Sequence, residues 1–474
     1  MDISVSDELV IPEDYQSVVK NIEAARKANP PKIEIPKSIK KVAARDKRPN
    51  YIAVFDGLVD LVLDQGRPVF LVKEGGALEL KEEVQINGKL YYPPPLEKIL
   101  WTVPRASEVV KHYECYSRIS EEQRNKEIYQ ELKEHHRNIS ELPSEAHYDL
   151  LASWVLHTYL MERFNYSPIL CFYAVAERGK SRTGKGISYV AYRGVHLLSV
   201  REHEIFRLAQ HSNASLFLDC MDIWKKTERA GSEDVILGRF ERGAKITRIL
   251  HPDRGAFNDT TIYYPFGPTI IATNVEPHKI LGTRAVSINM PDSSKKFNNE
   301  VKEDLFLPLR ERLTAFRALN LDKEFEVIDK PADGRLGDIL KPLFLIIRWI
   351  SPEREKDFHN LIKSIHQKKL ILKAETIEGQ ILCVVRDLQD VVNKGRVAVS
   401  DITNRFNADK SERSKIDVRT IGRKLDSLGF DKLSTGKGTS AIYWDEDKIN
   451  KLLDSYGLPK TQETQETPAK QGGG

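Results

Sequence analysis

The sequence is short of cysteine, of long apolar runs and of any large excess of one charge. Its four cysteines lie far apart and form no Cys-x-x-Cys pair, which argues against a disulfide framework and against a structural zinc site. No apolar run reaches the ~20 residues that a membrane-spanning helix needs. With 73 basic and 69 acidic residues the net charge is +4, so a contact with nucleic acid would depend on local basic patches.

The N-terminal stretch MDISVSDELVIPEDY is acidic and lacks the basic-then-apolar order of a signal peptide. We therefore expect a cytoplasmic protein with no membrane partner. The chain has 474 residues, of which 40% are hydrophobic and 30% are charged. This is an ordinary globular composition, and the length leaves room for several domains.

Composition and hydrophobic periodicity divide the chain into successive parts. They are a leader (1–48), a small β module (49–104), a helical segment (105–165), an α/β core (166–330), a second helical region (331–392), a winged helix-turn-helix unit (393–458) and a tail (459–474). The β module contains two hairpin signals, at Asp64-Gln65-Gly66 and at Asn87-Gly88. The low-complexity tail is expected to be disordered.

One glycine-rich stretch, AERGKSRTGKGISYVAYRG, is typical of a phosphate-binding loop. It follows the apolar run PILCFYAVA, which predicts a buried strand, and it precedes a helix that we expect to begin at GISYVAYRGV. The spacing fits the pattern G-x-x-x-x-G-K-[ST], except that glycine occupies the last position. In this interpretation the lysine contacts the β- and γ-phosphates, and the predicted nucleotide-binding residues are Gly179, Thr183, Gly184, Lys185 and Gly186. The alternative is a flexible turn with a surface lysine.

Three polar residues stand at the ends of later apolar runs. Asp219 ends NASLFLD and could hold magnesium, Asn274 ends GPTIIATN and could orient a water molecule, and Arg284 opens TRAVSINM and could reach a phosphate of a neighbouring subunit. Polar residues at the carboxyl ends of strands indicate a parallel sheet with its ligand outside those ends. Taken singly, these residues also fit a helix cap, a loop cap and a surface salt bridge.

The stretch from Tyr148 to Trp349 resembles AAA+-like and superfamily-three-like ATPases of plasmids, phages and other mobile elements. The resemblance is carried by LLASWVLHTYL before the loop and by FERGAKITRI, FGPTIIATN, TRAVSINMP and GRLGDILKPLFLII after it. It implies an α/β P-loop NTPase core of the AAA+-like kind, between the N-terminal β module and the C-terminal winged helix domain. It also implies ATP and Mg²⁺ as cofactors, DNA as a partner, and a homo-oligomer such as a hexameric helicase ring acting in replication.

The sequence departs from this family at two positions. Gly186 stands where a hydroxyl would hold magnesium, and Cys220 follows Asp219 where the family carries a glutamate. Because a cysteine cannot act as the carboxylate base, Asp222 becomes the candidate substitute. We therefore predict an ATPase or helicase that binds ATP and hydrolyses it slowly. The alternative is a DNA-binding protein without enzymatic activity, whose nucleotide site is structural or acts as a switch.

Two regions are candidates for contact with DNA. VSDITNRFN, with Ser400 as N-cap, and DVRTIGRKLDSLGF, with Asp417 as N-cap, predict two helices that are followed by a hairpin. This winged helix-turn-helix pattern predicts a second helix in the major groove, although a protein-binding winged helix remains the alternative. A turn at Pro252-Asp253-Arg254-Gly255 could also meet DNA, in the channel of a ring. The predicted DNA-binding residues are Arg254, Arg419, Arg423, Lys424 and Lys437.

Overall fold

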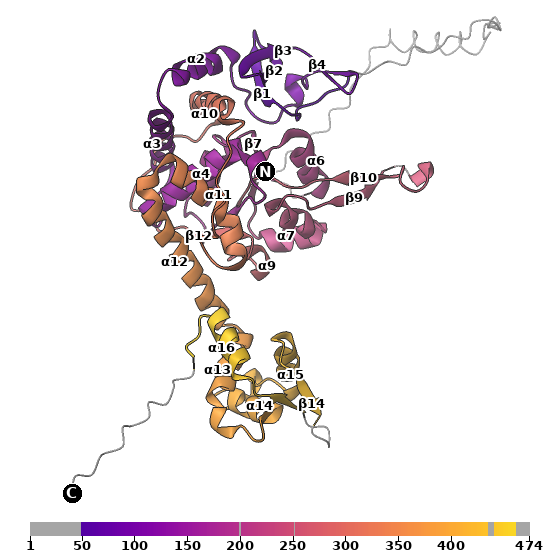
Figure 1. Ribbon diagram of the computed structural model, residues 1–474, viewed down its shortest axis with the longest axis vertical. Coiled ribbons are helices and arrows are strands. Elements are labelled where there is room, and N and C mark those ends of the chain that lie inside the picture. The colour runs from indigo at the N-terminus through magenta and orange to yellow at the C-terminus, as the bar shows by residue number, and fades with distance from the viewer. Residues whose placement is uncertain (1–48, 199–200, 251, 435–439, 461–474) are drawn as a thin grey trace, which may run out of the picture. The chain divides into compact units, whose positions relative to one another are not determined.

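The structure is a computed structural model, and it describes residues 49–198, 201–250, 252–434 and 440–460 (Figure 1). The predicted leader (1–48) and most of the predicted tail lie outside these residues. The described residues from Asn50 onward belong to one unit of contacts. Among the described helices, none is both long and apolar enough to cross a membrane.

A five-stranded parallel sheet forms the centre of the core, in the order β12-β6-β11-β8-β7. Its strands are β6 (Ile169–Tyr173), β7 (Gly194–Leu197), β8 (Ser215–Asp219), β11 (Thr269–Thr273) and β12 (Ala285–Asn289). The strands β6, β8 and β11 are runs of apolar residues that are buried almost throughout, as expected for a sheet that is covered on both faces. The predicted parallel α/β sheet is therefore confirmed.

Helices surround this sheet and continue beyond it. They are α2 (Ala106–Ser117), α3 (Glu121–Ile139), α4 (Glu145–Tyr159), α5 (Lys180–Ser188), α6 (Glu202–Ser212), α7 (Ile223–Ala230), α8 (Glu233–Leu237), α9 (Lys279–Gly282), α10 (Leu307–Asn320), α11 (Gly334–Ile350) and α12 (Glu355–Ala374). Every residue of α4 from Tyr148 to Tyr159 is buried, because this helix lies inside the core. Its buried Asp149 forms ion pairs with Lys133 and Arg354, at 2.5 Å and 2.7 Å.

The N-terminal strands form a small antiparallel sheet and a separate hairpin. The sheet contains β1 (Leu58–Asp64), β2 (Arg67–Glu74) and β3 (Ala77–Lys81), and the hairpin contains β4 (Val84–Ile86) and β5 (Lys89–Tyr91). Both predicted hairpin turns are present. Gln65 and Gly66 have φ of 47° and 79°, and Asn87 and Gly88 have φ of 50° and 75°, which is the left-handed pair of conformations that two-residue hairpin turns favour.

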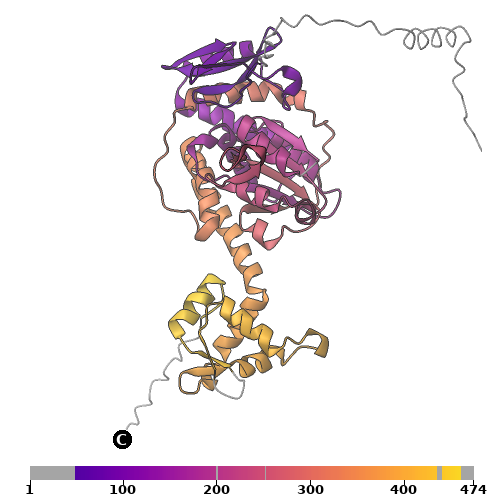
Figure 2. The same cartoon turned by 90° about the vertical axis from the view of Figure 1, so that its right-hand side faces the viewer.

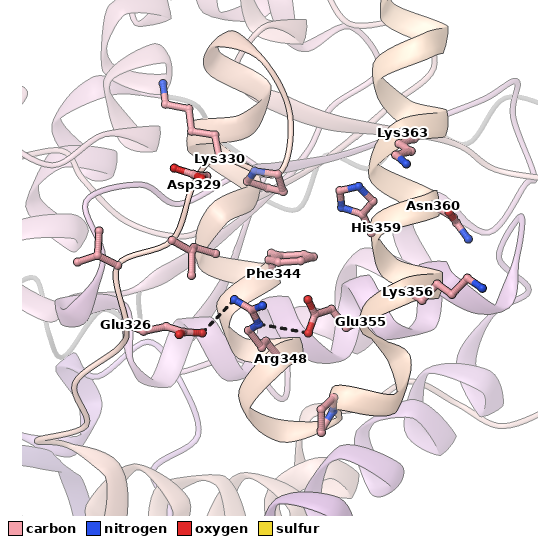
Figure 3. A pocket seen from close by; sticks show the side chains of 14 residues that line it. Glu326, Asp329, Lys330, Phe344, Arg348, Glu355, Lys356, His359, Asn360 and Lys363 are labelled. Atoms are coloured by element: carbon pink, nitrogen blue, oxygen red, sulfur yellow. Dashed lines mark hydrogen bonds and ion pairs between the residues drawn. The ribbon is translucent and has the colours of Figure 1, made fainter.

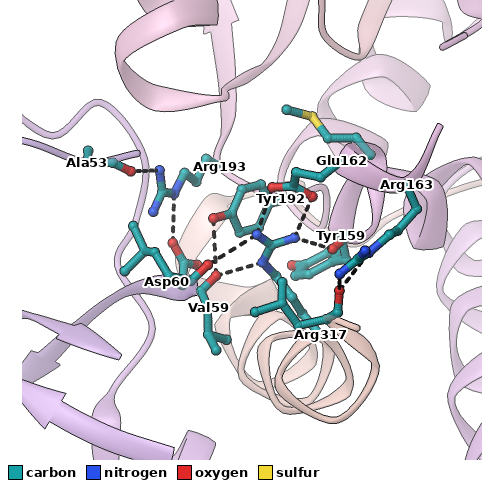
Figure 4. Close-up of polar contacts among 12 residues, drawn as sticks. Ala53, Val59, Asp60, Tyr159, Glu162, Arg163, Tyr192, Arg193 and Arg317 are labelled. Atoms are coloured by element: carbon teal, nitrogen blue, oxygen red, sulfur yellow. Dashed lines mark hydrogen bonds and ion pairs between the residues drawn. The ribbon is translucent and has the colours of Figure 1, made fainter. Parts of the chain in front are cut away.

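Two buried arginines join this N-terminal sheet to the rest of the core (Figure 4). Arg193, which follows α5, forms an ion pair with Asp60 of β1 at 2.7 Å. Arg317 of α10 donates to the carbonyl oxygen of Val59 at 2.7 Å and forms an ion pair with Glu162 at 2.7 Å. In Figure 2 the sheet lies across α10. The side chains of Arg193 and Arg317 are only 1% and 3% exposed, so their hydrogen bonds depend on partners within the protein. Arg193 also donates to the carbonyl oxygens of Ala53 and Ser212, at 2.6 Å and 2.9 Å.

Two separate hydrophobic clusters divide the described chain differently from the predicted parts. The first cluster is continuous from Ala53 to Ile362, so it includes the N-terminal sheet. The second runs from Ile381 to Leu453. We call the part of the chain from α13 to α16, which contains this cluster, the C-terminal unit. The elements of this unit are α13 (Ile377–Asp387), β13 (Arg396–Ala398), α14 (Val399–Asn407), α15 (Val418–Ser427), β14 (Lys432–Ser434), β15 (Ser440–Tyr443) and α16 (Glu446–Ser455).

The two helices and the hairpin that we predicted near the C-terminus are present as α14, α15 and the pair β14–β15. Asp417 caps α15 as predicted, because its carboxylate accepts from the backbone N–H of Thr420 at 2.9 Å. The predicted N-cap at Ser400 is wrong. The residue before α14 is Ala398, and Ser400 lies inside the first turn.

A long hairpin leaves the core between β8 and β11 (Figure 1). Its strands are β9 (Ile246–Ile249) and β10 (Thr260–Tyr263), which pair in antiparallel register. The short 3-10 helix η4 (Pro252–Arg254) lies near the tip. The turn predicted at Pro252-Asp253-Arg254-Gly255 is therefore at the far end of this hairpin.

Candidate functional site

The order of the strands places a topological switch point at the carboxyl ends of β6 and β11. The chain leaves β6 through α5 toward β7 at one edge of the sheet, whereas it leaves β11 through α9 toward β12 on the other side of β6. Ligands of open α/β sheets bind where neighbouring strands connect in opposite directions in this way. The loops after β6, β8 and β11 therefore define the candidate site.

The loop after β6 runs directly into the N-terminus of α5. This loop ends at Gly179, whose φ of 75° is left-handed, and α5 begins at Lys180. Gly179 is the N-cap and has no capping side chain, so the first backbone N–H groups of the helix are available to an anion. The prediction of a helix over GISYVAYRGV (186–195) is wrong at both ends, since α5 already begins at Lys180, ends at Ser188 and is followed by β7 from Gly194.

Gly184 and Gly186 are inside α5 and have a packing role. A Cβ atom at Gly184 would lie 2.3 Å from the ring of Phe217, and one at Gly186 would lie 2.4 Å from Cδ1 of Ile139. The absence of a side chain lets the helix approach β8 and α3 closely. The missing hydroxyl at Gly186 therefore reflects helix packing.

Lys180 and Ser181, the first two residues of α5, face the acid at the end of β8. The hydroxyl of Ser181 donates to Oδ1 of Asp219 at 3.1 Å. The ammonium group of Lys180 donates to the carbonyl oxygen of Val175, in the loop, at 2.6 Å. Burial lowers the pKa of Lys180, while the charge of Asp219 opposes this shift. The N-terminus of α5 thus brings together a cation, a hydroxyl group, a carboxylate and free backbone N–H groups.

The sequence pattern missed Lys180 and Ser181 because it was aligned five residues too far along the chain. The triplet Gly179-Lys180-Ser181 fits the end of G-x-x-x-x-G-K-[ST], but the first position of that alignment is Ala174. A search that required only G-K-[ST] directly after a buried strand would have found both residues.

The other predicted loop residues lie further along α5. Lys185 is half-buried in the second turn, where its charge, after the larger effect of burial, helps to lower the pKa of His196. Thr183 is buried, and its hydroxyl donates to the carbonyl oxygen of Gly179 at 2.9 Å. Its side chain therefore closes the first turn of the helix.

Asp219 is held at the end of β8 by neighbours on two sides. Besides Ser181, it has His196 of β7 near it, with Nε2 at 3.9 Å from Oδ2, and the ring of His196 stacks on Phe217 at 4.7 Å. The next residue, Cys220, is buried, and burial raises the pKa of its thiol. Asp219 is thus the carboxylate that lies beside the N-terminus of α5.

Asp222 has a structural task at the start of α7. Its carboxylate accepts from the backbone N–H of Lys225 at 3.2 Å and forms an ion pair with the ammonium group of the same residue at 3.3 Å. These contacts make it the N-cap of the helix. The structure gives Asp222 no contact with Asp219, Lys180 or Ser181 among the described interactions.

Asn274 comes directly after β11, at the same carboxyl end of the strands as Asp219. Its backbone N–H donates to the carbonyl oxygen of Met221 at 2.9 Å, and the hydroxyl of Thr273 donates to the same oxygen at 3.0 Å. In the sheet, Ala272 is opposite Asp219 and Thr273 is opposite Tyr173. The side chain of Asn274 is exposed, so it is free to contact a ligand between these loops.

Arg284 lies at the opposite, amino end of the strands. It precedes β12, and its carbonyl oxygen accepts from the backbone N–H of Ile169, the first residue of β6. Its guanidinium group donates to the carbonyl oxygen of Ile280 at 3.0 Å and lies 5.3 Å from the centre of the Phe240 ring. Because the strands are parallel, their amino ends are remote from the loops after β6, β8 and β11, so Arg284 lies away from the candidate site.

The residues present fit a magnesium ion that is bound together with a nucleotide. In the described part of the chain, no three His, Cys, Asp or Glu side chains gather closely enough to hold a metal ion by themselves. Magnesium in nucleotide sites commonly takes only one or two protein ligands, with phosphates and water completing its shell. The hydroxyl of Ser181 and the carboxylate of Asp219, 3.1 Å apart, are such a pair.

A cavity of about 520 Å³ lies beside the first turn of α5. Arg182 of α5, His135 and Asn138 of α3, and Asn298 and Asn299 of the segment after β12 line it. One ring nitrogen of His135 is 2.9 Å from the carbonyl oxygen of Gly186, and burial lowers the pKa of this ring to about 4. The cavity therefore offers amide groups and a neutral ring on the side of α5 that faces α3, and none of Lys180, Ser181, Asp219 and Asn274 lines it.

A larger groove of about 1020 Å³ lies between the segment 326–331 and the helices α11 and α12 (Figure 3). At one end Arg348 bridges Glu326 and Glu355, at 3.1 Å and 3.2 Å. None of the residues that line this groove comes from the loops after β6, β8 and β11. It is therefore separate from the candidate nucleotide site.

The predicted DNA-binding residues differ in how free their side chains are. Arg419 and Arg423 are exposed on α15, and Arg254 is exposed at the tip of the β9–β10 hairpin. Lys424 is instead half-buried and forms an ion pair with Glu378 of α13 at 2.6 Å. Lys437 lies outside the described residues.

No family model and no curated protein matches this chain. The solved structures that are similar to it include the apo A form of the C-terminal region of NrS-1, with 12% identity over 81% of this chain and 96% of that one, at a TM-score of 0.33. They also include Cch of SCCmec type IV, an active helicase, with 10% identity over 82% and 80% at a TM-score of 0.34. Cdc6p from Pyrobaculum aerophilum has 12% identity over 66% and 95%, at a TM-score of 0.21.

Proposed function

We propose that this chain is an ATP-binding, DNA-dependent replication protein of the helicase-like kind, with an AAA+-like P-loop core. The observation that supports this most is the meeting of Lys180, Ser181 and Asp219 at the N-terminus of α5, with the hydroxyl of Ser181 3.1 Å from the carboxylate. Together with the left-handed N-cap Gly179, these groups form a site for the phosphates of a nucleotide and its magnesium ion.

Each residue of the proposed site has a definite task. The backbone N–H groups at the start of α5 hold the phosphate oxygens, and Lys180 exchanges its bond with the carbonyl oxygen of Val175 for the β- and γ-phosphates. Ser181 and Asp219 would hold magnesium, which neutralises charge on the phosphates. Asn274 orients the attacking water from the end of β11.

Hydrolysis is expected to be slow in an isolated subunit. The residue after Asp219 is Cys220, a buried thiol whose pKa is raised, and Asp222 is engaged at the N-cap of α7. Without a carboxylate base the rate typically falls by about 10²- to 10⁴-fold. This same observation supports a second candidate function, in which the protein binds ATP as a switch and does not turn it over.

A homo-oligomer would complete the site. Arg284 lies at the amino end of β12, so its guanidinium group can serve only the nucleotide of a neighbouring copy. In a ring of such copies, each site would gain a cation next to the γ-phosphate. We propose that assembly of the ring in this way stimulates turnover.

The C-terminal unit is proposed to be a winged helix that contacts DNA. Its α15 follows α14 and precedes the β14–β15 hairpin, the arrangement in which the second helix enters the major groove. Arg419 and Arg423 are the exposed cations of α15. They would pair with phosphates or base edges.

A pair of matched variants tests the nucleotide site. Lys180→Ala should weaken binding of a fluorescent ATP analogue about 10- to 100-fold, since a charge-assisted hydrogen bond is lost. Lys185→Ala, in the second turn of the same helix, should bind as tightly as the wild-type protein. The opposite ranking would show that the phosphates lie further along α5. Equal, unchanged binding in both variants would rule out the site. Phosphate release with and without single-stranded DNA then separates the motor from the switch.

A further inference from the structure

The groove between the segment 326–331 and the helices α11 and α12 takes no part in the proposed nucleotide site (Figure 3). Its volume of about 1020 Å³ is at the upper end of what small-molecule sites occupy. Val327, which lines the groove, is 95% exposed, and the ring of Phe344 lies between the two walls. A groove of this size that offers apolar contacts indicates a surface for a larger partner.

One wall of the groove is an extended stretch of backbone without hydrogen-bond partners. In the described part of the chain, the N–H and C=O groups of residues 324–330 make no backbone hydrogen bond. The stretch is nevertheless held in place. The ring of Phe325 packs on those of Phe164 and Trp349, with centroids 4.8 Å and 5.5 Å away, and Ile328 packs against the first hydrophobic cluster. An ordered, extended backbone with free polar groups is an edge to which a further strand can add.

The opposite wall is the basic face of α12. Lys356 and Lys363 line the groove, are exposed and form no ion pair with another described residue. The other two cations of the lining are already neutralised, because Arg348 bridges two glutamates and Lys330 forms an ion pair with Asp338 at 2.7 Å. Two free ammonium groups along one wall attract a partner of negative charge.

We propose that this groove binds an extended peptide of another protein, in which acidic and apolar residues alternate. The backbone of the peptide pairs with residues 324–330, and its apolar side chains contact Val327 and Phe344. Its carboxylates reach the ammonium groups of Lys356 and Lys363. Alternation is required because successive side chains of a strand point to opposite faces. In strand addition the backbone hydrogen bonds provide affinity, and the side-chain contacts provide specificity.

A nucleic acid suits this groove less well than a peptide. Glu326 and Asp329 lie on the wall opposite α12, and Asp329 forms no ion pair with another described residue, so a phosphate backbone would meet repulsion there. The free N–H and C=O groups of residues 324–330 also match a peptide backbone, whose own groups recur at the spacing of a strand.

The test uses the full chain and a fluorescein-labelled peptide in which valine and aspartate alternate, with binding measured by anisotropy. The wild-type protein should bind this peptide and not its counterpart of valine and lysine. Lys356→Glu combined with Lys363→Glu should weaken binding of the acidic peptide about 10-fold or more, because two attractions become repulsions, and should bind the basic peptide instead. Lys126→Glu combined with Lys368→Glu changes the net charge equally at exposed positions outside the groove, and should behave as the wild type.

Methylated peptides test the pairing of the backbone. Alternate residues of a strand direct their N–H groups to the same edge. N-methylation of all valines therefore blocks one edge of the peptide, and N-methylation of all aspartates blocks the other. One of these two peptides should lose affinity, while the other should bind as the unmethylated peptide does.

Four outcomes would overturn the proposal. Undiminished binding of the acidic peptide by the Lys356→Glu, Lys363→Glu variant would exclude the basic wall, and undiminished binding of both methylated peptides would exclude strand addition. A single-stranded oligonucleotide that binds the wild type and not this variant, while the acidic peptide binds neither, would assign the groove to nucleic acid. A smaller oligomer of this variant in size-exclusion chromatography would assign it to a second copy of the chain. An unchanged Tm in both double variants confirms that they are folded.

Discussion

Glycines that look alike in the sequence have different reasons for being there. Gly179 supplies a left-handed backbone that no capping side chain assists, whereas Gly186 has ordinary helical geometry and makes room for Ile139. A substitution at Gly179 would therefore strain the backbone, whereas a substitution at Gly186 would disturb side-chain packing.

At Gly186 the expected consequence of adding a hydroxyl is loss of stability. In Gly186→Ser the new Cβ would lie 2.4 Å from Cδ1 and 2.9 Å from Cγ2 of Ile139. Overpacking of this kind typically costs about 1–3 kcal/mol. Thermal unfolding should show a lower Tm with no gain in ATP turnover. Gly282→Ser, in the short helix α9 where the nearest atom is 4.0 Å from the Cβ position, is the matched control and should change the Tm little. A faster ATPase in Gly186→Ser would contradict this account.

At the level of single residues the sequence predicts only part of the candidate site. Asp219 and Asn274 were found because each ends an apolar strand, and the structure places both at the carboxyl ends of the neighbouring strands β8 and β11. Lys180 and Ser181 were missed because the pattern was required to begin with glycine, and this chain has Ala174 there. The task of Asp222 could not be predicted, because the start of α7 depends on how the chain turns after β8.

At the scale of elements, the basic side chains of α15 fall into two groups, some exposed to solvent and one paired with another helix. Arg419 and Arg423 are exposed, while Lys424 reaches across to Glu378 of α13. Three basic residues that looked equivalent along the sequence are therefore expected to contribute unequally to DNA binding.

Binding to a duplex oligonucleotide over a series of salt concentrations should show this difference. Arg419→Ala combined with Arg423→Ala should lower the slope of log K against log salt by about two, because each lost cation releases about one counterion fewer. Lys424→Ala should leave that slope unchanged, since its charge already neutralises Glu378. A slope that is unchanged in the double variant would favour the protein-contact alternative.

Element types were predictable where the hydrophobic period was clear. Four strands of the central sheet (β6, β8, β11 and β12), the hairpins at Gln65-Gly66 and Asn87-Gly88, and the helices α14 and α15 are present as predicted. The strand β7 was not predicted, because its first residues were assigned to a helix. The start of α5 could not be predicted, because its first two turns contain lysine, arginine and two glycines and therefore lack an apolar stripe. Only the packing of Gly184 against Phe217 reveals why a helix forms there.

At the scale of the whole molecule, buried neutral histidines make the fold sensitive to acid. Burial lowers the pKa of His135 and His147 to about 4 and that of His157 to about 3, and it places the pKa of His136 well below its usual value. These rings lie on α3 and α4. In the unfolded chain these rings take up protons below pH ~6.5, whereas in the folded chain they take them up only at a lower pH.

Stability should therefore fall as the pH drops from about 6.5 toward 4, because the unfolded state binds more protons in this range. A fully buried ring such as His157 contributes up to about 1.4 kcal/mol per pH unit. Calorimetry at pH 7.5 and at pH 5.5 should give a lower Tm at the lower pH, and His157→Phe should reduce the difference. His203→Phe, at an exposed position of α6, should leave it as it is. Equal Tm values at both pH values in the wild-type protein would contradict this expectation.

The way in which the N-terminal sheet joins the core could not be predicted from the sequence. Arg193 and Arg317 are charged residues in otherwise ordinary segments, and periodicity assigns such residues to the surface. Only the tertiary structure shows that they are buried against Asp60, Val59 and Glu162. The predicted boundary near residue 104 therefore divides a single hydrophobic cluster.

These two guanidinium groups also determine which parts of such a chain can be exchanged by recombination. The C-terminal unit has its own hydrophobic cluster, and the chain enters it from α12. A crossover in the second half of that helix, after Ile365, would leave both hydrophobic clusters whole. A crossover after the N-terminal sheet would bring in a new strand without partners for Arg193 and Arg317. Each buried charge left unpaired would cost about 3–5 kcal/mol. Among chains of this kind, we expect the C-terminal unit to be replaced freely and the N-terminal sheet to be inherited with the nucleotide-binding core.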